Sequence, residues 1–207
     1  MLANRYLPIL FLLSTAALSQ PAAANESVYT DLDLDRCQTI ASDDMGASMK
    51  CKGYKDYPIY FAEGDLRQSV LYGPVRAELI EGAFESFAPF NHVNTKVEWR
   101  LDGSGRPVAA ILRWFLENVG DTGMPTKEAE GQVLVIARVA QPDDGLSCVV
   151  GYVDALSNSN ANELARKVAD NEARDFACGM QEAMWEGKRG AKASEETHVW
   201  PEGLVVE

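Results

Sequence analysis

Between residues 96 and 101 the chain alternates strictly between apolar and charged positions. The apolar set is Val97, Trp99 and Leu101, and a lysine, a glutamate and an arginine precede them in turn. Because successive side chains of a β-strand point to opposite faces, this alternation predicts a strand with one apolar face. The turn sequence Asp-Gly-Ser-Gly follows at residues 102–105, so we expect the strand to turn back as a β-hairpin.

Three further hairpins are predicted from short runs that are rich in β-branched or aromatic residues and are bounded by Gly, Pro and Asp. The four predicted strand pairs are residues 36–40 with 48–53, 58–62 with 66–72, 96–101 with 108–116, and 132–140 with 146–154. The strands of the last pair are apolar on both faces. This pattern is typical of central strands that are covered on both sides.

Two segments carry helical spacing. In residues 75–87 an apolar residue recurs at every fourth position, which predicts a helix that ends before Pro89. A second helix is expected to begin at Asn160, with Glu163 three residues later to complete a capping box. The pairs Glu163–Lys167 and Asp170–Arg174 have the i,i+4 spacing of ion pairs on a solvated helix face.

Hairpins followed by segregated helices favour an α+β fold. We expect an antiparallel sheet of about seven or eight strands, with one middle and one C-terminal helix. The alternative is a closed β-barrel with an attached helix. We predict a single domain over residues 25–182 and a loosely ordered C-terminal tail over residues 183–207.

The first 24 residues have the pattern of a secretory signal peptide. Arg5 supplies a positive charge, residues 7–18 form an apolar run, and Ala22–Ala24 offers a small-residue cleavage site. A spanning helix needs about 20 apolar residues, so this run is too short for a permanent anchor. We therefore expect cleavage near Ala24 and a periplasmic or secreted product.

The chain is strongly acidic, with 31 Asp and Glu against 19 Lys and Arg in 207 residues and a formal net charge of −12. Removal of residues 1–24, which contain Arg5 and no acid, leaves 183 residues and a charge of −13. Such a charge repels phosphate backbones and anionic lipid surfaces. We therefore expect neither nucleic acid nor a membrane surface as a partner.

The four cysteines suit two disulfides in an exported protein. Cys37 and Cys51 lie seven residues on either side of Asp44, in the first predicted turn, so they should face each other across the hairpin. Cys148 lies in a predicted strand, and Cys178 ends the helix that must pack back on it. Each bond should stabilise by roughly 3–4 kcal/mol. A four-cysteine zinc site is disfavoured because no C-x-x-C pair is present.

Few residues offer catalytic chemistry. The two histidines are His92, in a predicted loop, and His198, in the predicted tail. Ser104 and Ser147 lie in no G-x-S-x-G motif. We assign no catalytic residue, no metal ligand and no cofactor from the sequence.

Three carboxylates, those of Asp31, Asp33 and Asp35, share one face of an extended segment. They are candidates for binding Ca²⁺, but an EF-hand loop would need a glycine where Arg36 stands and a glutamate where Ser42 stands. A solvated edge that blocks strand pairing is the favoured interpretation.

Tyrosines and arginines give weaker candidates for ligand contacts. Tyrosines gather near the second hairpin, where they could stack on sugar rings, although cross-strand packing is the commoner use. They are Tyr54, Tyr57, Tyr60 and Tyr72. Arg67 and Arg113 lie among apolar neighbours, and each is expected to pair with an acid or to anchor an anionic ligand.

Several short runs resemble a set of uncharacterised exported proteins of Gram-negative proteobacteria. The runs are Tyr29-Thr30-Asp31-Leu32-Asp33, Cys51-Lys52-Gly53-Tyr54, Gly64-Asp65-Leu66-Arg67 and Tyr152-Val153-Asp154-Ala155-Leu156. The resemblance spans about residues 29–178. It implies a periplasmic address, and it implies no activity, cofactor or site residue.

These observations predict a non-catalytic periplasmic binding protein whose partner is a protein or a small ligand. Acidity would suit a basic partner, for example a basic hydrolase such as lysozyme that the protein inhibits. The alternative is a hydrolase that uses paired carboxylates on cell-wall or sugar substrates. A barrel-type carrier of a small ligand is a third hypothesis.

Overall fold

The computed structural model describes residues 26–201, and the predicted signal peptide lies outside the described residues. The largest sheet has seven strands in the order β1-β8-β9-β10-β11-β12, with β7 also paired to β9. Its strands are β1 (Glu26–Asp31), β7 (Asn91–Val93), β8 (Lys96–Leu101), β9 (Pro107–Leu116), β10 (Gly131–Arg138), β11 (Cys148–Asp154) and β12 (Met184–Trp185). The pairs are antiparallel, except that β12 runs parallel to β11.

Two smaller sheets and two α-helices complete the described fold. A four-stranded sheet contains β2 (Gln38–Ser42), β3 (Gly46–Tyr54), β4 (Tyr57–Gly64) and β5 (Arg67–Tyr72). A two-stranded sheet pairs β6 (Phe84–Phe87) with β13 (Glu196–Val199). The helices are α1 (Ala77–Gly82) and α2 (Ala161–Asn171), and a short 3-10 turn covers Leu34–Arg36.

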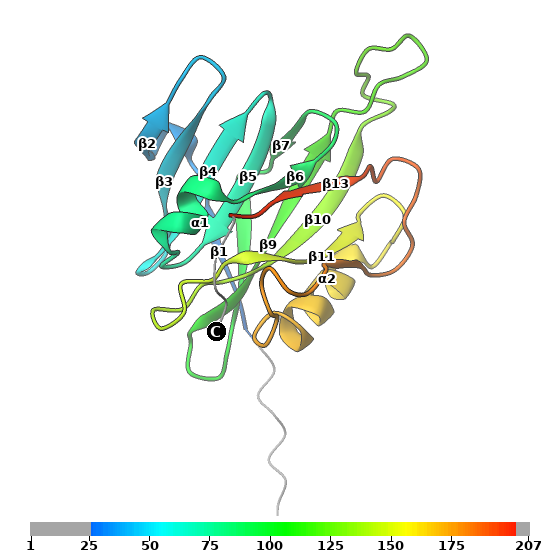
Figure 1. The fold of residues 1–207 in the computed structure, drawn as a ribbon. Coiled ribbons are helices and arrows are strands. Elements are labelled where there is room, and N and C mark those ends of the chain that lie inside the picture. Colours follow the sequence, from blue (N-terminus) through cyan, green and yellow to red (C-terminus); the bar gives the residue numbers. More distant parts are fainter. Residues whose placement is uncertain (1–25, 202–207) are drawn as a thin grey trace, which may run out of the picture.

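The large sheet is the middle of three layers, with the four-stranded sheet on one face and α2 on the other (Figure 1). The predicted alternation in β8 explains this arrangement. Trp99 faces the four-stranded sheet, where it contacts Tyr72 edge to face at 5.7 Å between ring centroids. Glu98 and Arg100 occupy the other face and bind side chains of α2. One strand therefore supplies an apolar core on one side and a buried polar layer on the other.

Helix α2 packs closely on the large sheet through small residues. Ala161, Ala165 and Ala169, spaced four residues apart, are its buried positions. Strand β11, on which α2 packs, also has a small residue at the contact. A Cβ atom on Gly151 would lie 3.0 Å from Cγ1 of Val168. The amphipathic pattern that predicted this helix therefore also fixes which of its faces touches the sheet.

The structure confirms the α+β class and the four predicted hairpins. The described sheets do not close into a barrel, so the alternative fold is wrong. We expected one sheet of about seven or eight strands, whereas residues 26–201 form thirteen strands in three sheets, the largest with seven. Several of the additional strands are only two to four residues long, and such lengths leave little periodicity in a sequence.

The middle helix is shorter than predicted. It ends at Gly82, and Ala83 already has the extended backbone angles φ −87° and ψ 136°. The second half of the predicted helix is strand β6, which pairs with β13 from the far end of the chain. A distant pairing partner has overridden the local helical spacing, because that spacing carries no information about the partner strand.

The segment expected to be a loosely ordered tail contributes β12 and β13 to two sheets. Residues 202–207 lie outside the described residues.

The polar groups of α2 also differ from the prediction. Asn160 makes no side-chain capping bond. Lys167 and Asp170 of α2, and Arg174 just after it, pair with charged residues from other parts of the chain. The pairs are Lys167–Glu186, Asp170–Arg100 and Arg174–Asp102.

Candidate functional site

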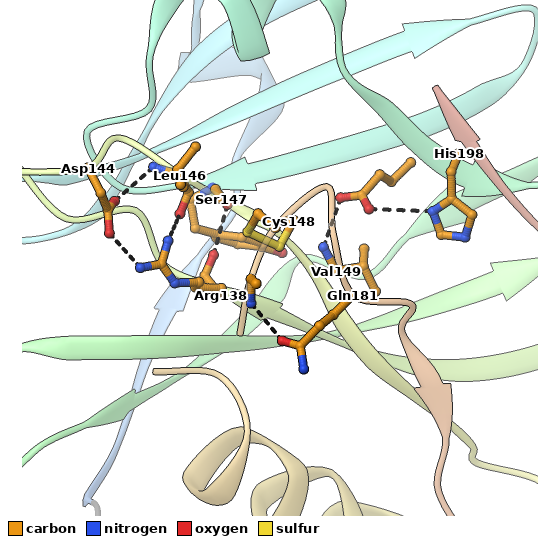
Figure 2. The surroundings of a disulfide bond; sticks show 12 residues. Arg138, Asp144, Leu146, Ser147, Cys148, Val149, Gln181 and His198 are labelled. Carbon is orange, nitrogen blue, oxygen red and sulfur yellow. Dashed lines mark hydrogen bonds and ion pairs between the residues drawn. A yellow bond between two sulfur atoms is a disulfide. The ribbon is translucent and has the colours of Figure 1, made fainter. Parts of the chain in front are cut away.

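Both predicted disulfides form. Cys37 and Cys51 join the 3-10 turn to β3, with 4.4 Å between their Cα atoms. Cys148 and Cys178 join β11 to the chain that follows α2, with 5.7 Å between their Cα atoms. The second bond holds a long irregular segment against the large sheet, and the candidate site lies around that segment (Figure 2).

Residues 176–186 begin a few residues after the end of α2 at Asn171 and include β12, which pairs with β11. Hydrogen bonds within the segment fix its first turn. The carbonyl of Ala177 accepts bonds from the backbone N–H groups of Met180 at 3.0 Å and Gln181 at 2.9 Å. In return, the side-chain oxygen of Gln181 accepts a bond from the N–H of Ala177 at 2.7 Å, which Figure 2 shows. The disulfide and this turn give the segment a defined shape.

Two pockets lie along this segment and share Phe176, Gln181 and Glu182 in their linings. The first, of about 200 Å³, lies between the segment and the β6–β13 sheet. The second, of about 290 Å³, lies between the segment and α2. We call them together the β11 groove. Its other principal lining residues are Glu85, Val149, Val150, Lys167, Met180, Met184, Trp185, Glu186, His198 and Trp200.

A buried carboxylate stands at one end of the β11 groove. Glu85 is 8% exposed, and its Oε2 accepts a hydrogen bond of 2.8 Å from the backbone N–H of Val149 in β11. Its Oε1 lies 3.4 Å from Nδ1 of His198 in β13. Figure 2 labels the two partners, Val149 and His198, and marks both contacts with dashed lines. Glu85 therefore covers an open edge of β11 and links it to the small sheet.

The pKa of His198 lies above its ordinary value. The hydrogen bond to Glu85 is the main cause, partial burial opposes it, and the charges of Glu85, Glu196 and Glu182 add to it. A raised pKa in the folded state means that the His198–Glu85 contact stabilises the protein fully below the unfolded value of 6.5. This stabilisation is lost as the pH rises through the folded-state pKa.

We expect Glu85→Gln to lower the pKa of His198 toward 6.5, because the variant removes its principal counter-charge. Proton NMR of the His198 ring measures this titration. The ring signals of His92, which stacks on Phe115 away from the groove, report in the same sample that the fold is intact. An unchanged His198 titration would contradict the assigned contact.

The rest of the β11 groove combines apolar and acidic side chains. Met180 and Met184 are each 75% exposed, somewhat more than Met45 at 63% and Met124 at 65%. Glu172, Glu182 and Glu186 line the same groove, and Lys167 pairs with Glu186 at 2.8 Å. Methionine is flexible and polarisable, so it adapts to varied apolar partners. The arrangement suits an apolar ligand that carries positive charge.

The other residues that the sequence singled out lie apart from this groove, except that Ser147 is next to Cys148. His92 is on β7, 3.3 Å from a carboxylate oxygen of Glu117. Ser104 donates to Asp102 at 2.6 Å in the β8–β9 turn. Ser147 is buried, and its hydroxyl donates to the carbonyl of Arg138 at 2.9 Å.

The three carboxylates of the Asp31–Asp35 segment do not come together at one site. Asp31 pairs with Lys96, while Asp33 and Asp35 are exposed around the 3-10 turn. In residues 26–201 no group of three or more His, Cys, Asp or Glu side chains is placed to hold a metal ion.

The tyrosines and arginines divide between packing and polar contacts. Tyr72 is buried in the core and Tyr57 donates to Gln141, whereas Tyr60 lies half-buried on the four-stranded sheet. Arg67 binds Asp65, as predicted for pairing with an acid. Arg113 donates to the side-chain oxygen of Gln132 at 3.0 Å.

Sequence reasoning singled out His198 but missed the other residues that build the β11 groove. Glu85 fell within a predicted helix, and Met180 and Met184 fell near or within the predicted tail. The useful signal was the pair of methionines in a polar stretch, since a methionine there has no helical or strand pattern to explain it.

Comparison of the chain with protein-family models, with curated proteins and with solved structures found no match. The resemblance to exported proteobacterial proteins therefore stays a prediction. Two disulfides indicate an oxidising location outside the cytoplasm. Among the described residues, no helix has both the length and the hydropathy needed to cross a membrane.

Proposed function

We propose that this protein is a non-catalytic periplasmic binding protein, and that its β11 groove takes a basic, partly apolar segment of a partner protein. The observation that carries this proposal is that the exposed Met184 lines one pocket with the carboxylates of Glu172, Glu182 and Glu186, and the exposed Met180 lines the adjoining pocket with Glu182 and Glu85. Cationic side chains on the partner would meet the carboxylates, and its apolar side chains would meet the methionines.

The net charge of the whole chain supports the same proposal. A formal charge of −12 attracts basic partners at a distance and speeds their encounter. A basic hydrolase such as lysozyme is one partner of this kind, and occupation of the groove by one of its loops would make the protein an inhibitor. Secretion through a cleaved signal peptide would place the protein where such enzymes act.

Methyl NMR with selectively labelled methionine tests the proposal directly. On addition of a decapeptide of alternating Lys and Leu, we expect the methyl signals of Met180 and Met184 to shift. The exposed Met45 on the β2–β3 turn and Met124 in the loop before β10 serve as internal controls and should not shift. A matched peptide of alternating Glu and Leu should leave all four signals unchanged.

Charge reversal supplies the second arm of the test. The double variant Glu172→Lys, Glu182→Lys should weaken binding of the Lys/Leu peptide about tenfold or more, equivalent to about 1.4 kcal/mol. The matched control Glu78→Lys, Glu81→Lys changes two exposed acids of α1 by the same charge. Equal loss of affinity in both variants would show that the peptide responds only to the net charge of the protein. This result would contradict specific binding in the β11 groove.

Assays on the same samples address inhibition and catalysis. Retarded clearing of a peptidoglycan suspension by a basic lysozyme, relieved by the groove reversal, would identify the partner class. Release of new reducing ends by the protein alone, abolished by Glu85→Gln, would favour the alternative of a carboxylate-dependent hydrolase and would overturn the non-catalytic proposal.

A further inference from the structure

A second surface of opposite charge lies on the β3–β4 hairpin. Three lysines, Lys50, Lys52 and Lys55, fall within six residues of a chain whose net charge is −12. All three line one open pocket of about 410 Å³, together with Asp56 and Tyr60. Three cations and one carboxylate therefore meet in this pocket, which we call the lysine pocket.

Aromatic rings lie beside two of these cations. Lys50 and Tyr60 are direct cross-strand partners, and Nζ of Lys50 lies 5.7 Å from the centroid of the Tyr60 ring. Nζ of Lys55 lies 4.8 Å from the centroid of the Tyr54 ring. Each contact holds a flexible lysine near a fixed aromatic face. The pocket thus combines the ring of Tyr60, with the Lys50 ammonium over it, and two further lysines of the same hairpin.

The backbone of the hairpin is held in place around the pocket. The Cys37–Cys51 disulfide anchors β3 between Lys50 and Lys52. A Cβ atom at Gly53 would lie 2.2 Å from the carbonyl oxygen of Tyr57. The two strands therefore approach too closely for any residue except glycine at position 53. Lys55 has a φ of 49°, in the left-handed region that usually favours glycine or asparagine.

We infer that the lysine pocket binds a short anionic saccharide, such as an oligomer of uronic acids. The ammonium groups would bind the carboxylates, and the face of Tyr60 would stack on a sugar ring. A free phosphate or a polyphosphate would use the lysines but would not need the aromatic face. A long polyanion would also meet repulsion from the rest of this acidic protein, which favours a short ligand. The inference is independent of the function proposed for the β11 groove.

Calorimetric titration with tetragalacturonate at low ionic strength tests the inference. We expect saturable binding that weakens with added salt, because exposed charges are screened. Maltotetraose, a neutral oligosaccharide of equal length, should not bind measurably. Absence of tetragalacturonate binding at millimolar concentration would overturn the proposal.

Two variants locate the site. Lys50→Gln, Lys52→Gln, Lys55→Gln should weaken binding tenfold or more, while Lys127→Gln, Lys188→Gln, Lys192→Gln removes the same charge elsewhere and should change it less than twofold. The six side chains are exposed, so both variants should fold and keep the Cys37–Cys51 disulfide. Equal weakening by the two triple variants would show non-specific attraction and would reject the site.

The variant Tyr60→Leu separates a saccharide site from a simple anion site. We expect it to weaken tetragalacturonate severalfold and to leave the affinity for pyrophosphate unchanged. Pyrophosphate that binds the native protein as tightly as tetragalacturonate, together with no effect of Tyr60→Leu on either ligand, would overturn the saccharide assignment.

Discussion

Loss of the Cys148–Cys178 disulfide is expected to lower the free energy of unfolding by roughly 3–4 kcal/mol. The bond closes a loop across a sequence separation of 30 residues, and its cysteines are 2% and 0% exposed. Its removal restores conformational entropy to the unfolded chain and weakens the packing around α1. Urea unfolding of the double variant Cys148→Ala, Cys178→Ala measures the change, and alanine avoids the burial of new polar groups.

The other disulfide provides a matched control. Cys37→Ala, Cys51→Ala opens a loop with a sequence separation of only 14 residues, and Cys37 is partly exposed, so the loss should be smaller, at about 3 kcal/mol or less. The two variants should also differ in their effect on the β11 groove. Only loss of Cys148–Cys178 should move the Met180 methyl signal, because only that bond anchors residues 176–186. If removal of the Cys37–Cys51 bond costs as much stability as removal of the Cys148–Cys178 bond, or more, the larger contribution assigned to Cys148–Cys178 is wrong.

Glu98→Gln should destabilise the protein by about 3 kcal/mol, the lower end expected when one partner of a buried ion pair is removed. Glu98 is 8% exposed on the α2 face of β8 and accepts hydrogen bonds from Arg166 Nε at 2.6 Å and from the hydroxyl of Ser27. Nη1 of Arg100 lies 3.9 Å from the same carboxylate. Without the charge of Glu98, the two guanidinium groups lose a counter-charge under α2. Urea unfolding at pH 7 measures the difference.

The pH dependence of this difference has a defined sign. Burial opposes ionisation of Glu98, but the bonds from Arg166 and Ser27 outweigh it, so its pKa lies below the ordinary value of 4.5. A lowered folded-state pKa contributes stability that is present above pH 4.5 and is lost as the pH falls through the folded-state value. The difference in the free energy of unfolding between the native protein and Glu98→Gln should therefore become smaller at acidic pH.

Glu163→Gln, an exposed change on α2, is the control for this experiment and should stay within about 0.5 kcal/mol of the native protein at pH 7. If Glu98→Gln destabilises the protein as little as this control does, the polar layer beneath α2 adds no stability.

The buried polar layer also shows how far a local pattern can be interpreted. The alternation in β8 correctly placed Trp99 on an apolar face and Glu98 on the opposite one. An alternating strand usually has a solvated polar face, whereas here that face lies under α2. Whether a helix covers the polar face depends on where α2 packs, and nothing within residues 96–101 encodes that position.

The sequence by itself determined the features that depend on residues close together along the chain. Each hairpin follows from its own turn and alternation, and the Cys37–Cys51 bond follows from two cysteines placed evenly about one turn. The bond between Cys148 and Cys178 was also predicted, because the chain that follows a strand and a helix packs back on the sheet, although Cys178 lies beyond the end of α2 at Asn171 rather than at the end of the helix. The hairpins and the first bond need only a few residues to specify them.

Only the tertiary structure decided the pairing of β6 with β13 and hence the β11 groove. Glu85 and His198 meet although 113 positions separate them, and neither has a local pattern that identifies the other. The same holds for Met180 and Met184, whose exposure depends on where the disulfide holds their segment. A contact between distant parts of the chain is set by the packing of whole layers, so it leaves no periodic signal at either of its ends.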